Sequence, residues 1–230
     1  MIFESWLTYL SQYNLFVLFV FFLIENAALF YLSILIGKIL EPENTILHRT
    51  DIKWLVSTVI CNTFITLLGY ELYLYGILKI DFSPSAIFLI LDTLLLILLM
   101  DFFMFCFHYL VHHLKWFYPI HKLHHTHVET SVYSLFVLHP VETFGFGFIW
   151  LFLISVLELN YISIIIYLIL NLSYGIFGHL KTDIFPHFWY NNYFTKWIST
   201  TKFHSNHHKN ESRNYGFYFT IWDKIFKTTI

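Results

Sequence analysis

Long apolar stretches separated by short polar segments dominate this chain. Each has about the length, roughly 20 residues, that a helix needs to cross the hydrocarbon core of a bilayer. The five stretches are Leu15–Gly37, Ile52–Leu78, Ala86–Phe107, Val141–Leu157 and Tyr161–Gly178. Only residues 158–160 separate the last two, so we expect a tight helical hairpin that either crosses the membrane twice or dips in and returns. The pattern predicts an all-α, multi-pass helical membrane protein.

Composition agrees with this fold class. Of the 230 residues, 57% are hydrophobic, 22% are aromatic and 12% are Asp, Glu, Lys or Arg, whereas a soluble domain carries about 25% charged residues. The formal net charge of −2 gives no sign of a nucleic-acid partner. Cys61 and Cys106 lie in apolar segments and offer neither a disulfide framework nor a CxxC metal site. The N-terminus lacks a basic region and a small-residue cleavage site, so we predict no cleavable signal peptide.

Basic residues are divided unequally between the two sides of the predicted spans. Of the 13 Lys and Arg residues, only Lys79 falls on one side. The other side has Lys38, Arg49, Lys53, Lys115, Lys122, Lys181, Lys196, Lys202, Lys209, Arg213, Lys224 and Lys227. Because basic loops are retained in the cytoplasm, we predict that this second side is cytoplasmic. The hairpin returns the chain to that side, so the histidine-rich segments before and after it can meet there.

Histidines gather where the third predicted span ends. Seven of the 14 histidines fall within residues 108–127. An HxxxH pattern occupies residues 108–112, and HxxHH patterns occupy residues 121–125 and 204–208. We expect Pro119 to end the third helix, and each HxxHH to present three rings on one side of a helical turn, since residues three and four apart share a face. Imidazole is the commonest ligand for transition metals, so this number of rings suggests several metal ions and an oxidising chemistry.

A purely structural role is the default for one or two histidines. For eight rings near lipid it would leave many polar groups without partners, at a cost of about 1–3 kcal/mol for each one buried. Asp101 precedes His108 by seven residues and His112 by eleven, which places all three on one helical stripe. We predict that Asp101 orients an imidazole through its free N–H; the alternative is an Asp that snorkels or bonds to another helix.

The remaining histidines have different expected roles. Neighbours of His113 and His127 already fill the available ligand positions, so we leave both outside the metal shell. His48 and His187 stand alone and are expected to be ordinary interfacial residues. His179, at the end of the last apolar stretch, is a candidate ligand. His139, before Pro140, is open between a ligand, a hydrogen-bond donor to a ligand and a structural anchor.

Further motifs follow the first HxxHH in a specific order. They are His139-Pro140-Val141-Glu142, the lone His179, the second HxxHH, Asn214-Tyr215-Gly216, and Trp222-Asp223 followed by Phe226. Together with HxxxH and the first HxxHH, this order resembles the fatty acid hydroxylase/sterol desaturase superfamily of membrane di-iron oxidoreductases. The departures are Val137 where that family often has Arg, Leu180-Lys181 where Ser-Asn is common, and Phe226-Lys227-Thr228 where it closes on Phe-Gly-Thr. None of them removes a candidate ligand.

The resemblance implies an organisation and a metal centre. Residues 1–99 would supply N-terminal transmembrane helices and residues 100–228 the catalytic region, as one integrated domain. Two iron ions would be held by nine histidines: His108, His112, His121, His124, His125, His179, His204, His207 and His208. O2 would be the co-substrate, and a sterol, fatty acyl chain or related lipid would be hydroxylated or desaturated.

Electrons would come from a separate donor, either a cytochrome b5-like protein or a ferredoxin or reductase. The nearest approach to a dinucleotide fingerprint, Gly145-Phe146-Gly147, lacks a third glycine and lies in an apolar stretch. No haem-binding HPGG segment and no fused ferredoxin is visible.

Other functions fit the sequence less well. An acyl desaturase of the other histidine-box superfamily would lack the Asn-Tyr-Gly and Trp-Asp elements, and a zinc hydrolase would offer HExxH, which does not occur. From another class, a metal transporter would distribute its ligands along the spans, and a b-type haem carrier would pair histidines at membrane depth. Here the histidines gather at one surface.

Overall fold

The computed structural model describes residues 2–41, 47–83 and 85–229. Its helices are α1 (Ile2–Leu10), α2 (Leu15–Leu40), α3 (Ile52–Leu74), α4 (Ala86–His113), α5 (Tyr118–His121), α6 (Pro140–Val156), α7 (Tyr161–Gly178), α8 (Thr201–Lys209) and α9 (Ile221–Ile225). Short 3₁₀ turns are η1 (His124–Thr126), η2 (Ser134–Phe136), η3 (His187–Tyr190) and η4 (Thr195–Trp197). Strands β1 (Ile80–Asp81) and β2 (Leu159–Asn160) form a parallel pair of two residues each. The predicted all-α class is confirmed.

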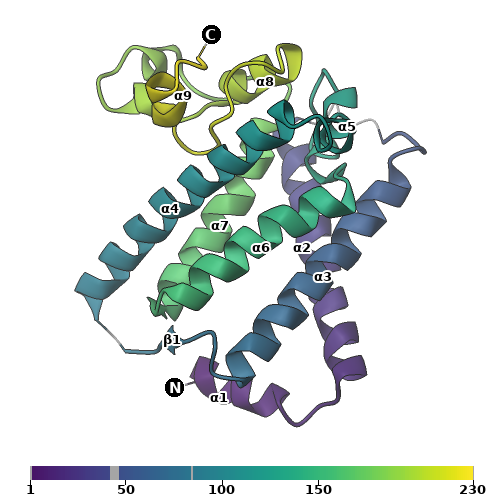
Figure 1. The fold of residues 1–230 in the computed structure, drawn as a ribbon, viewed down its shortest axis with the longest axis vertical. Coiled ribbons are helices and arrows are strands. Elements are labelled where there is room, and N and C mark those ends of the chain that lie inside the picture. Colours follow the sequence, from purple (N-terminus) through teal and green to yellow (C-terminus); the bar gives the residue numbers. More distant parts are fainter. Residues whose placement is uncertain (1, 42–46, 84, 230) are drawn as a thin grey trace.

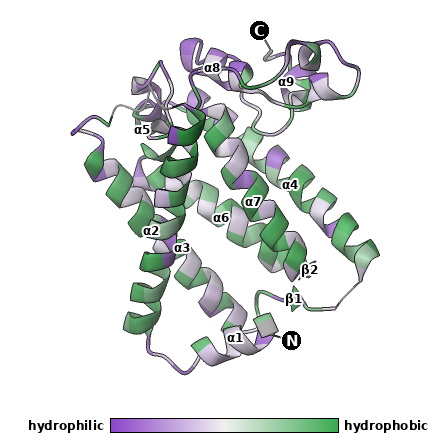
Figure 2. Cartoon of the chain, turned by 180° about the vertical axis from the view of Figure 1, so that it is seen from behind, coloured by the Kyte–Doolittle hydropathy of each residue, from purple (hydrophilic) through white to green (hydrophobic). Residues whose placement is uncertain are grey.

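The long helices run between two ends of the molecule. At one end lie α1 and the β1–β2 pair, and at the other α5, α8 and α9 gather over the ends of α4 and α7 (Figure 1). We call the two segments at this second end, residues 108–139 with the last turns of α4 and residues 179–229, the cap. Figure 2 shows that apolar residues dominate the long helices and that hydrophilic residues concentrate in the cap. The molecule thus separates a lipid-compatible body from a polar end.

Four helices are long and apolar enough to cross a membrane: α2, α3, α4 and α7. The helix α6 is apolar but has only 17 residues. Four of the five predicted stretches therefore meet the length that a crossing requires, and α6 is the shorter arm of the predicted hairpin. Asp92 of α4 stabilises the turn of that hairpin, because its carboxylate accepts a hydrogen bond from the Asn160 backbone N–H at 2.8 Å.

The predicted boundaries near the first histidines are wrong in two respects. The helix α4 continues past Phe107 to His113 and ends before Pro119 is reached. Pro119 instead lies in the first turn of α5, where its missing N–H breaks no intrahelical bond. The α5 helix then ends at His121, and His124 and His125 lie in the separate turn η1. The first HxxHH is thus a bent segment, whereas the second lies within the single helix α8.

Close helix packing depends on small residues at several crossings. A Cβ added at Gly37 of α2 would lie 2.5 Å from Cβ of Val132 in the cap. Val132 is 1% exposed and belongs to a buried apolar cluster with Ile34 and Val137. Because the obstructing atom is next to the Val132 backbone, no rotation of a side chain can remove the overlap. Gly37 therefore sets how closely α2 approaches the cap.

This packing gives a stability prediction. Replacing Gly37 by Ala should force α2 away from Val132 and lower the free energy of unfolding by about 1–3 kcal/mol, the usual cost of overpacking. Thermal unfolding in detergent measures the effect as a lower Tm. Ala28→Leu adds a larger side chain at an exposed position of the same helix and should leave Tm nearly unchanged. An unchanged Tm for Gly37→Ala would contradict the packing described.

Candidate metal centre

The structure brings the nine candidate histidines together in two groups. The first group contains His108, His112, His121, His125 and His207, and the second contains His124, His179, His204 and His208. Within each group the nitrogens that could bind a metal all lie within 4.8 Å of one another. Eight of the nine residues are buried, and His112 is partly buried. Both groups lie in the cap, at the end of α4 and α7.

The two HxxHH segments are shared between the groups. In each segment, the first and last rings, four residues apart, belong to one group, and the middle ring belongs to the other. Thus His121 and His125 join the first group while His124 joins the second. In α8 the assignment is reversed, since His207 alone joins the first group. The two groups are therefore interleaved, and each HxxHH contributes to both.

The Nδ1 atoms of five rings are tied to oxygen acceptors. The pairs are His108 with the Tyr215 carbonyl at 2.9 Å, His121 with Oε1 of Glu142 at 2.6 Å, His179 with the Gly175 carbonyl at 2.9 Å, His207 with the Arg213 carbonyl at 2.6 Å, and His208 with the His127 carbonyl at 3.0 Å. A carbonyl or carboxylate oxygen can only accept, so Nδ1 must carry the proton in each ring. In the neutral ring, Nε2 is then left with a free lone pair.

These lone pairs face one another at short range. In the first group, Nε2 of His108 lies 3.1 Å from Nε2 of His121, although both rings have their proton on Nδ1. In the second group, Nε2 of His204 lies 3.1 Å from Nε2 of His208 and 3.4 Å from Nε2 of His179. Lone pairs at this distance with no proton between them repel. A cation placed among them turns the repulsion into coordination, and a metal–nitrogen bond of about 2.1 Å puts neighbouring ligand nitrogens about 3.0–3.4 Å apart. The donor sets fit two transition-metal ions.

Burial keeps the rings outside the spans neutral at pH 7. It lowers the pKa of His121 and of His179 to about 4 in each case. Burial, followed by the neighbouring imidazoles, also lowers the pKa values of His124, His204 and His208 well below the usual 6.5. Only a neutral imidazole can bind a metal, so this environment prepares the groups for coordination.

A turn after α8 orients His108. Asn214 has a left-handed backbone with φ of 60°, a conformation that Asn tolerates better than most residues. Gly216 packs so closely that an added Cβ would lie 2.3 Å from the Phe219 carbonyl oxygen. The buried carboxylate of Asp223 accepts hydrogen bonds from the N–H groups of Tyr215 at 2.8 Å and Gly216 at 2.7 Å. This turn directs the Tyr215 carbonyl at Nδ1 of His108, which explains the Asn-Tyr-Gly and Trp-Asp elements.

The role predicted for Asp101 is wrong. Its carboxylate accepts hydrogen bonds from the Tyr218 backbone N–H at 2.6 Å and from Nε1 of Trp222 at 2.7 Å, and the described contacts join it to no imidazole. Seven residues of helix separate it from His108, a rise of about 10 Å. The two residues lie on the same side of α4 but at different positions along its axis. Asp101 instead ties the membrane helix α4 to the end of the cap, as in the alternative of a bond to another part of the fold.

The other histidines lie outside both groups. His113 is exposed and stacks on Tyr109 with ring centroids 3.9 Å apart. The Nε2 atom of His127 lies 3.3 Å from a carboxylate oxygen of Asp51. The backbone carbonyl of His127 accepts a hydrogen bond from Nδ1 of His208, a member of the second group. His139 is a structural anchor, since its Nδ1 caps α6 by accepting from the Val141 N–H at 3.2 Å. His48 and His187 are exposed.

Sequence reasoning missed Glu142 as a partner of a candidate ligand. Glu142 is 2% exposed and lies in the first turn of α6, where a carboxylate is favoured by the helix dipole. Its Oε1 accepts the Nδ1–H of His121. The HPxE pattern carried the signal, because His139 caps the helix and Pro140 starts it, which places the acid at its N-terminus. The four carbonyl partners have no signal, since every residue has a carbonyl.

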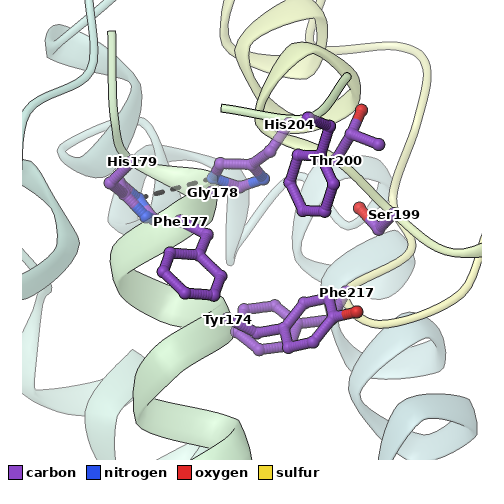
Figure 3. A pocket seen from close by; sticks show the side chains of 9 residues that line it. Tyr174, Phe177, Gly178, His179, Ser199, Thr200, His204 and Phe217 are labelled. Carbon is purple, nitrogen blue, oxygen red and sulfur yellow. Dashed lines mark hydrogen bonds between the residues drawn. The ribbon is translucent and has the colours of Figure 1, made fainter. Parts of the chain in front are cut away.

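A small cavity lies beside the second group. Its volume is about 10 Å³, room for about one water molecule. The rings of Tyr174, Phe177 and Phe217 surround it together with those of His179 and His204 (Figure 3). Its wall is mostly apolar, and two candidate ligands, His179 and His204, form part of that wall.

Comparison with known proteins identifies relatives for the part of the chain that carries the site. A family model described as fatty acid hydroxylase matches residues 93–228, more than half of the chain. The human cholesterol 25-hydroxylase is 26% identical over 147 residues, which cover 64% of this chain and 54% of that protein. Lathosterol oxidase of Rattus norvegicus is 26% identical over 178 residues, covering 76% and 56%. Methylsterol monooxygenase 1 of Gallus gallus is 32% identical over 124 residues, covering 53% and 40%.

The chain thus spans about half the length of these relatives. No solved structure matches it. Glu41 and Asp51 contact the cap from outside the matched residues: Glu41 accepts from the Lys181 N–H at 2.8 Å, and Asp51 contacts His127. The region before residue 93 therefore supports the site as well as the membrane-compatible body.

Burial of neutral imidazoles predicts how pH affects the metal-free protein. The unfolded chain protonates His121 and His179 below pH 6.5, whereas the folded chain does so only near pH 4. The unfolded state therefore binds more protons between these values, and the free energy of unfolding falls as the pH is lowered through this window. Each residue should contribute a loss of about 2 kcal/mol between pH 7 and pH 5.

The measurement is Tm of the chelator-treated protein in detergent at pH 7 and pH 5. The drop should shrink in His121→Ala and persist in His187→Ala, which changes an exposed ring. A Tm independent of pH over this range would show that the rings are not buried in the neutral form.

The contact between Glu142 and His121 gives a second prediction. Glu142→Ala should lower metal affinity by about 10- to 100-fold, because His121 loses the acceptor that fixes its tautomer. Glu142→Gln keeps an acceptor oxygen and should recover part of the loss. Glu158→Gln, at the exposed turn of the same hairpin, is the control. Metal titration of the chelator-treated protein measures the affinity, and equal affinities for Glu142→Ala and the native chain would refute the role of Glu142.

Proposed function

Because the chain belongs to the fatty acid hydroxylase family, we propose that it is an O2-dependent di-iron oxidoreductase that hydroxylates or desaturates a C–H position of a lipid. The observation that carries the proposal is the pair of interleaved histidine groups, in which His108 and His121 direct unprotonated Nε2 atoms at one another and each group could hold a cation. The relatives named as a cholesterol hydroxylase and a methylsterol monooxygenase support a lipid as the substrate.

The first group would supply five nitrogens to one iron and the second group four to the other. When bound, the two irons would supply the activation of O2 and the removal of hydrogen from an unactivated C–H bond. The ligand type alone does not select iron, since imidazole also suits zinc and copper. The chain's own contribution is to hold the rings neutral, fix the tautomers of five of them and surround the centre with buried side chains.

The cavity beside His179 and His204 is where we place the substrate carbon. Its apolar wall of Tyr174, Phe177 and Phe217 would exclude water and hold a methylene group or ring against the second group. At about 10 Å³ it admits only a small part of a lipid, so these rings must rotate to admit the chain on either side of that carbon.

We place the cap on the cytoplasmic side of the membrane. The support is the distribution of basic residues, with Lys79 alone at the end of α1 and the β1–β2 pair. Hydroxylation by O2 incorporates one oxygen atom and releases the other as water, which consumes two electrons and two protons from outside the substrate. A separate donor, such as a cytochrome b5-like protein or a ferredoxin with its reductase, would deliver the electrons at the cap.

The geometry disfavours the alternatives from other classes. A b-type haem needs two axial nitrogens about 4 Å apart on opposite faces of a porphyrin, whereas the Nε2 atoms of His112 and His207 lie 3.1 Å apart. A transporter would place ligands at successive depths along the spans. Here both groups lie at the same end of the helices.

The test measures metal and product in the same preparations. The chain is expressed in a sterol-free host together with an electron donor, as the native sequence, as His124→Ala and as His48→Ala. We expect about two irons per chain and a new oxidised lipid for the native chain and for His48→Ala. His124→Ala should lose both, because the second group loses one of four ligands. Zinc alone, haem absorbance, or equal losses in His48→Ala would overturn the proposal.

A further inference from the structure

A large groove lies in the cap outside both histidine groups. Its volume is about 630 Å³, within the range of about 300–1,000 Å³ typical of small-molecule sites. Residues between 183 and 206 form most of its wall, and Asn214, Thr220, Lys224 and Thr229 complete it. None of the nine candidate metal ligands lines it. The metal centre therefore does not account for this groove.

Three lysines line the groove, Lys196, Lys202 and Lys224, and we call it the lysine groove. Among the described residues, none of the three forms an ion pair with a carboxylate. The one acidic side chain in the wall is Asp183, and its carboxylate already accepts from the Tyr190 hydroxyl and the Phe185 N–H. Three lysines against one aspartate leave the groove with an excess of positive charge, and no ion pair among the described residues neutralises any of the three ammonium groups.

Two of these ammonium groups lie near the same aromatic ring. Nζ of Lys224 lies 4.0 Å from the centre of the Trp197 ring, and Nζ of Lys196 lies 5.3 Å from the same ring. Burial and the neighbouring Lys196 together lower the pKa of Lys224. Two like charges over one indole repel, and an anion between them would remove the repulsion.

The lysine groove adjoins the small cavity of the metal centre. Phe185 and Thr200 line both spaces, and Thr200 lies beside His204 in the cavity (Figure 3). A ligand with a charged head and an apolar tail could therefore occupy both. Its head would contact the lysines, and its tail would pass between Phe185 and Thr200 toward the second histidine group.

We propose that the lysine groove binds the anionic head group, of the phosphate type, of a lipid substrate whose apolar tail enters the cavity. The inference rests on the proposed function, because it assigns the substrate class of the same centre. A neutral sterol would supply no negative charge to balance the three ammonium groups. We favour a lipid over an acidic electron-donor protein because the groove is concave and shares two wall residues with the cavity, whereas docking a carrier requires only an exposed basic surface.

The test compares two amphiphiles that share a C16 chain and differ in the head group: hexadecyl phosphate, which is anionic, and hexadecanol, which is neutral. Both are titrated against the iron-loaded full chain in nanodiscs of neutral lipid, without O2 or an electron donor, so that binding is measured apart from turnover. The native chain should bind hexadecyl phosphate at least about tenfold more tightly than hexadecanol. The preference should disappear in Lys196→Gln/Lys224→Gln, while hexadecanol binding stays unchanged.

A matched control removes two lysines elsewhere. In Lys38→Gln/Lys53→Gln the same charge is lost from exposed residues that also lie near aromatic rings, Tyr133 and Trp54, but outside the groove. This variant should keep the native preference for hexadecyl phosphate. If it loses the preference equally, the effect is a general one of surface charge and the proposal fails.

Three further outcomes would overturn the proposal: equal affinity for the two amphiphiles, inorganic phosphate binding as tightly as hexadecyl phosphate, and a groove variant that only slows reduction by an acidic donor protein. The last would assign the lysines to the electron donor. Iron content and lipid oxidation, measured separately, test the proposed function. If the chain holds no iron but still prefers hexadecyl phosphate, the proposed function is wrong and the head-group site stands. If the chain oxidises lipid but shows no preference, the proposed function stands and the head-group site is wrong.

Discussion

The structure depends most on the constraint that imidazole lone pairs cannot face one another without a cation between them. Nine neutral rings converge in the cap, and their Nε2 atoms approach to between 3.0 and 3.4 Å along several pairs. Carbonyl oxygens and Glu142 hold the opposite nitrogens and so prevent the rings from turning away. The same hydrogen bonds that satisfy the rings therefore create an arrangement that metal ions would stabilise.

Two buried carboxylates, one in a membrane-compatible helix and one in the cap, carry this arrangement outward. Asp223 holds the turn whose carbonyl orients His108, and Asp101 holds the backbone and indole a few residues away. The end of the chain is thus attached both to the first histidine group and to α4. These contacts join a helix suited to lipid contact and a polar cap into one support for the histidines. Asp101 therefore acts on the first histidine group through the cap, since the described contacts join it to no imidazole.

Local sequence patterns predicted a large part of this structure. The apolar stretches predicted α2, α3, α4 and the α6–α7 hairpin, because helix length and lipid compatibility are properties of a single segment. The resemblance carried by the histidine motifs implied the same nine rings that the structure gathers into two groups. Their division between the groups was not predictable, because it depends on how α8 docks against η1, a contact between residues about 80 positions apart in the chain.

Two errors have a similar origin. Helical spacing placed Asp101 on the same side of the helix as His108. Spacing does not say which groups lie at the level of Asp101 along the helix axis, and there its carboxylate accepts hydrogen bonds from the cap. Pro119 was expected to end a helix and instead begins one, because proline is compatible with a first turn as well as with a stop. The backbone carbonyl partners could not be predicted at all, since they are positioned by the tertiary fold and are common to every residue type.

The interleaving of the two histidine groups also determines when the centre can form. Both groups need a ring from α8, and α8 occupies residues 201–209 of a 230-residue chain. While the chain is being synthesised, the rings from α4, α5 and η1 are already in place at the membrane surface, but each group still lacks its late members. Neither site can close until the last helices have been inserted and α8 has folded back. A chain truncated before α8 would therefore lack His204, His207 and His208, and neither group could be completed.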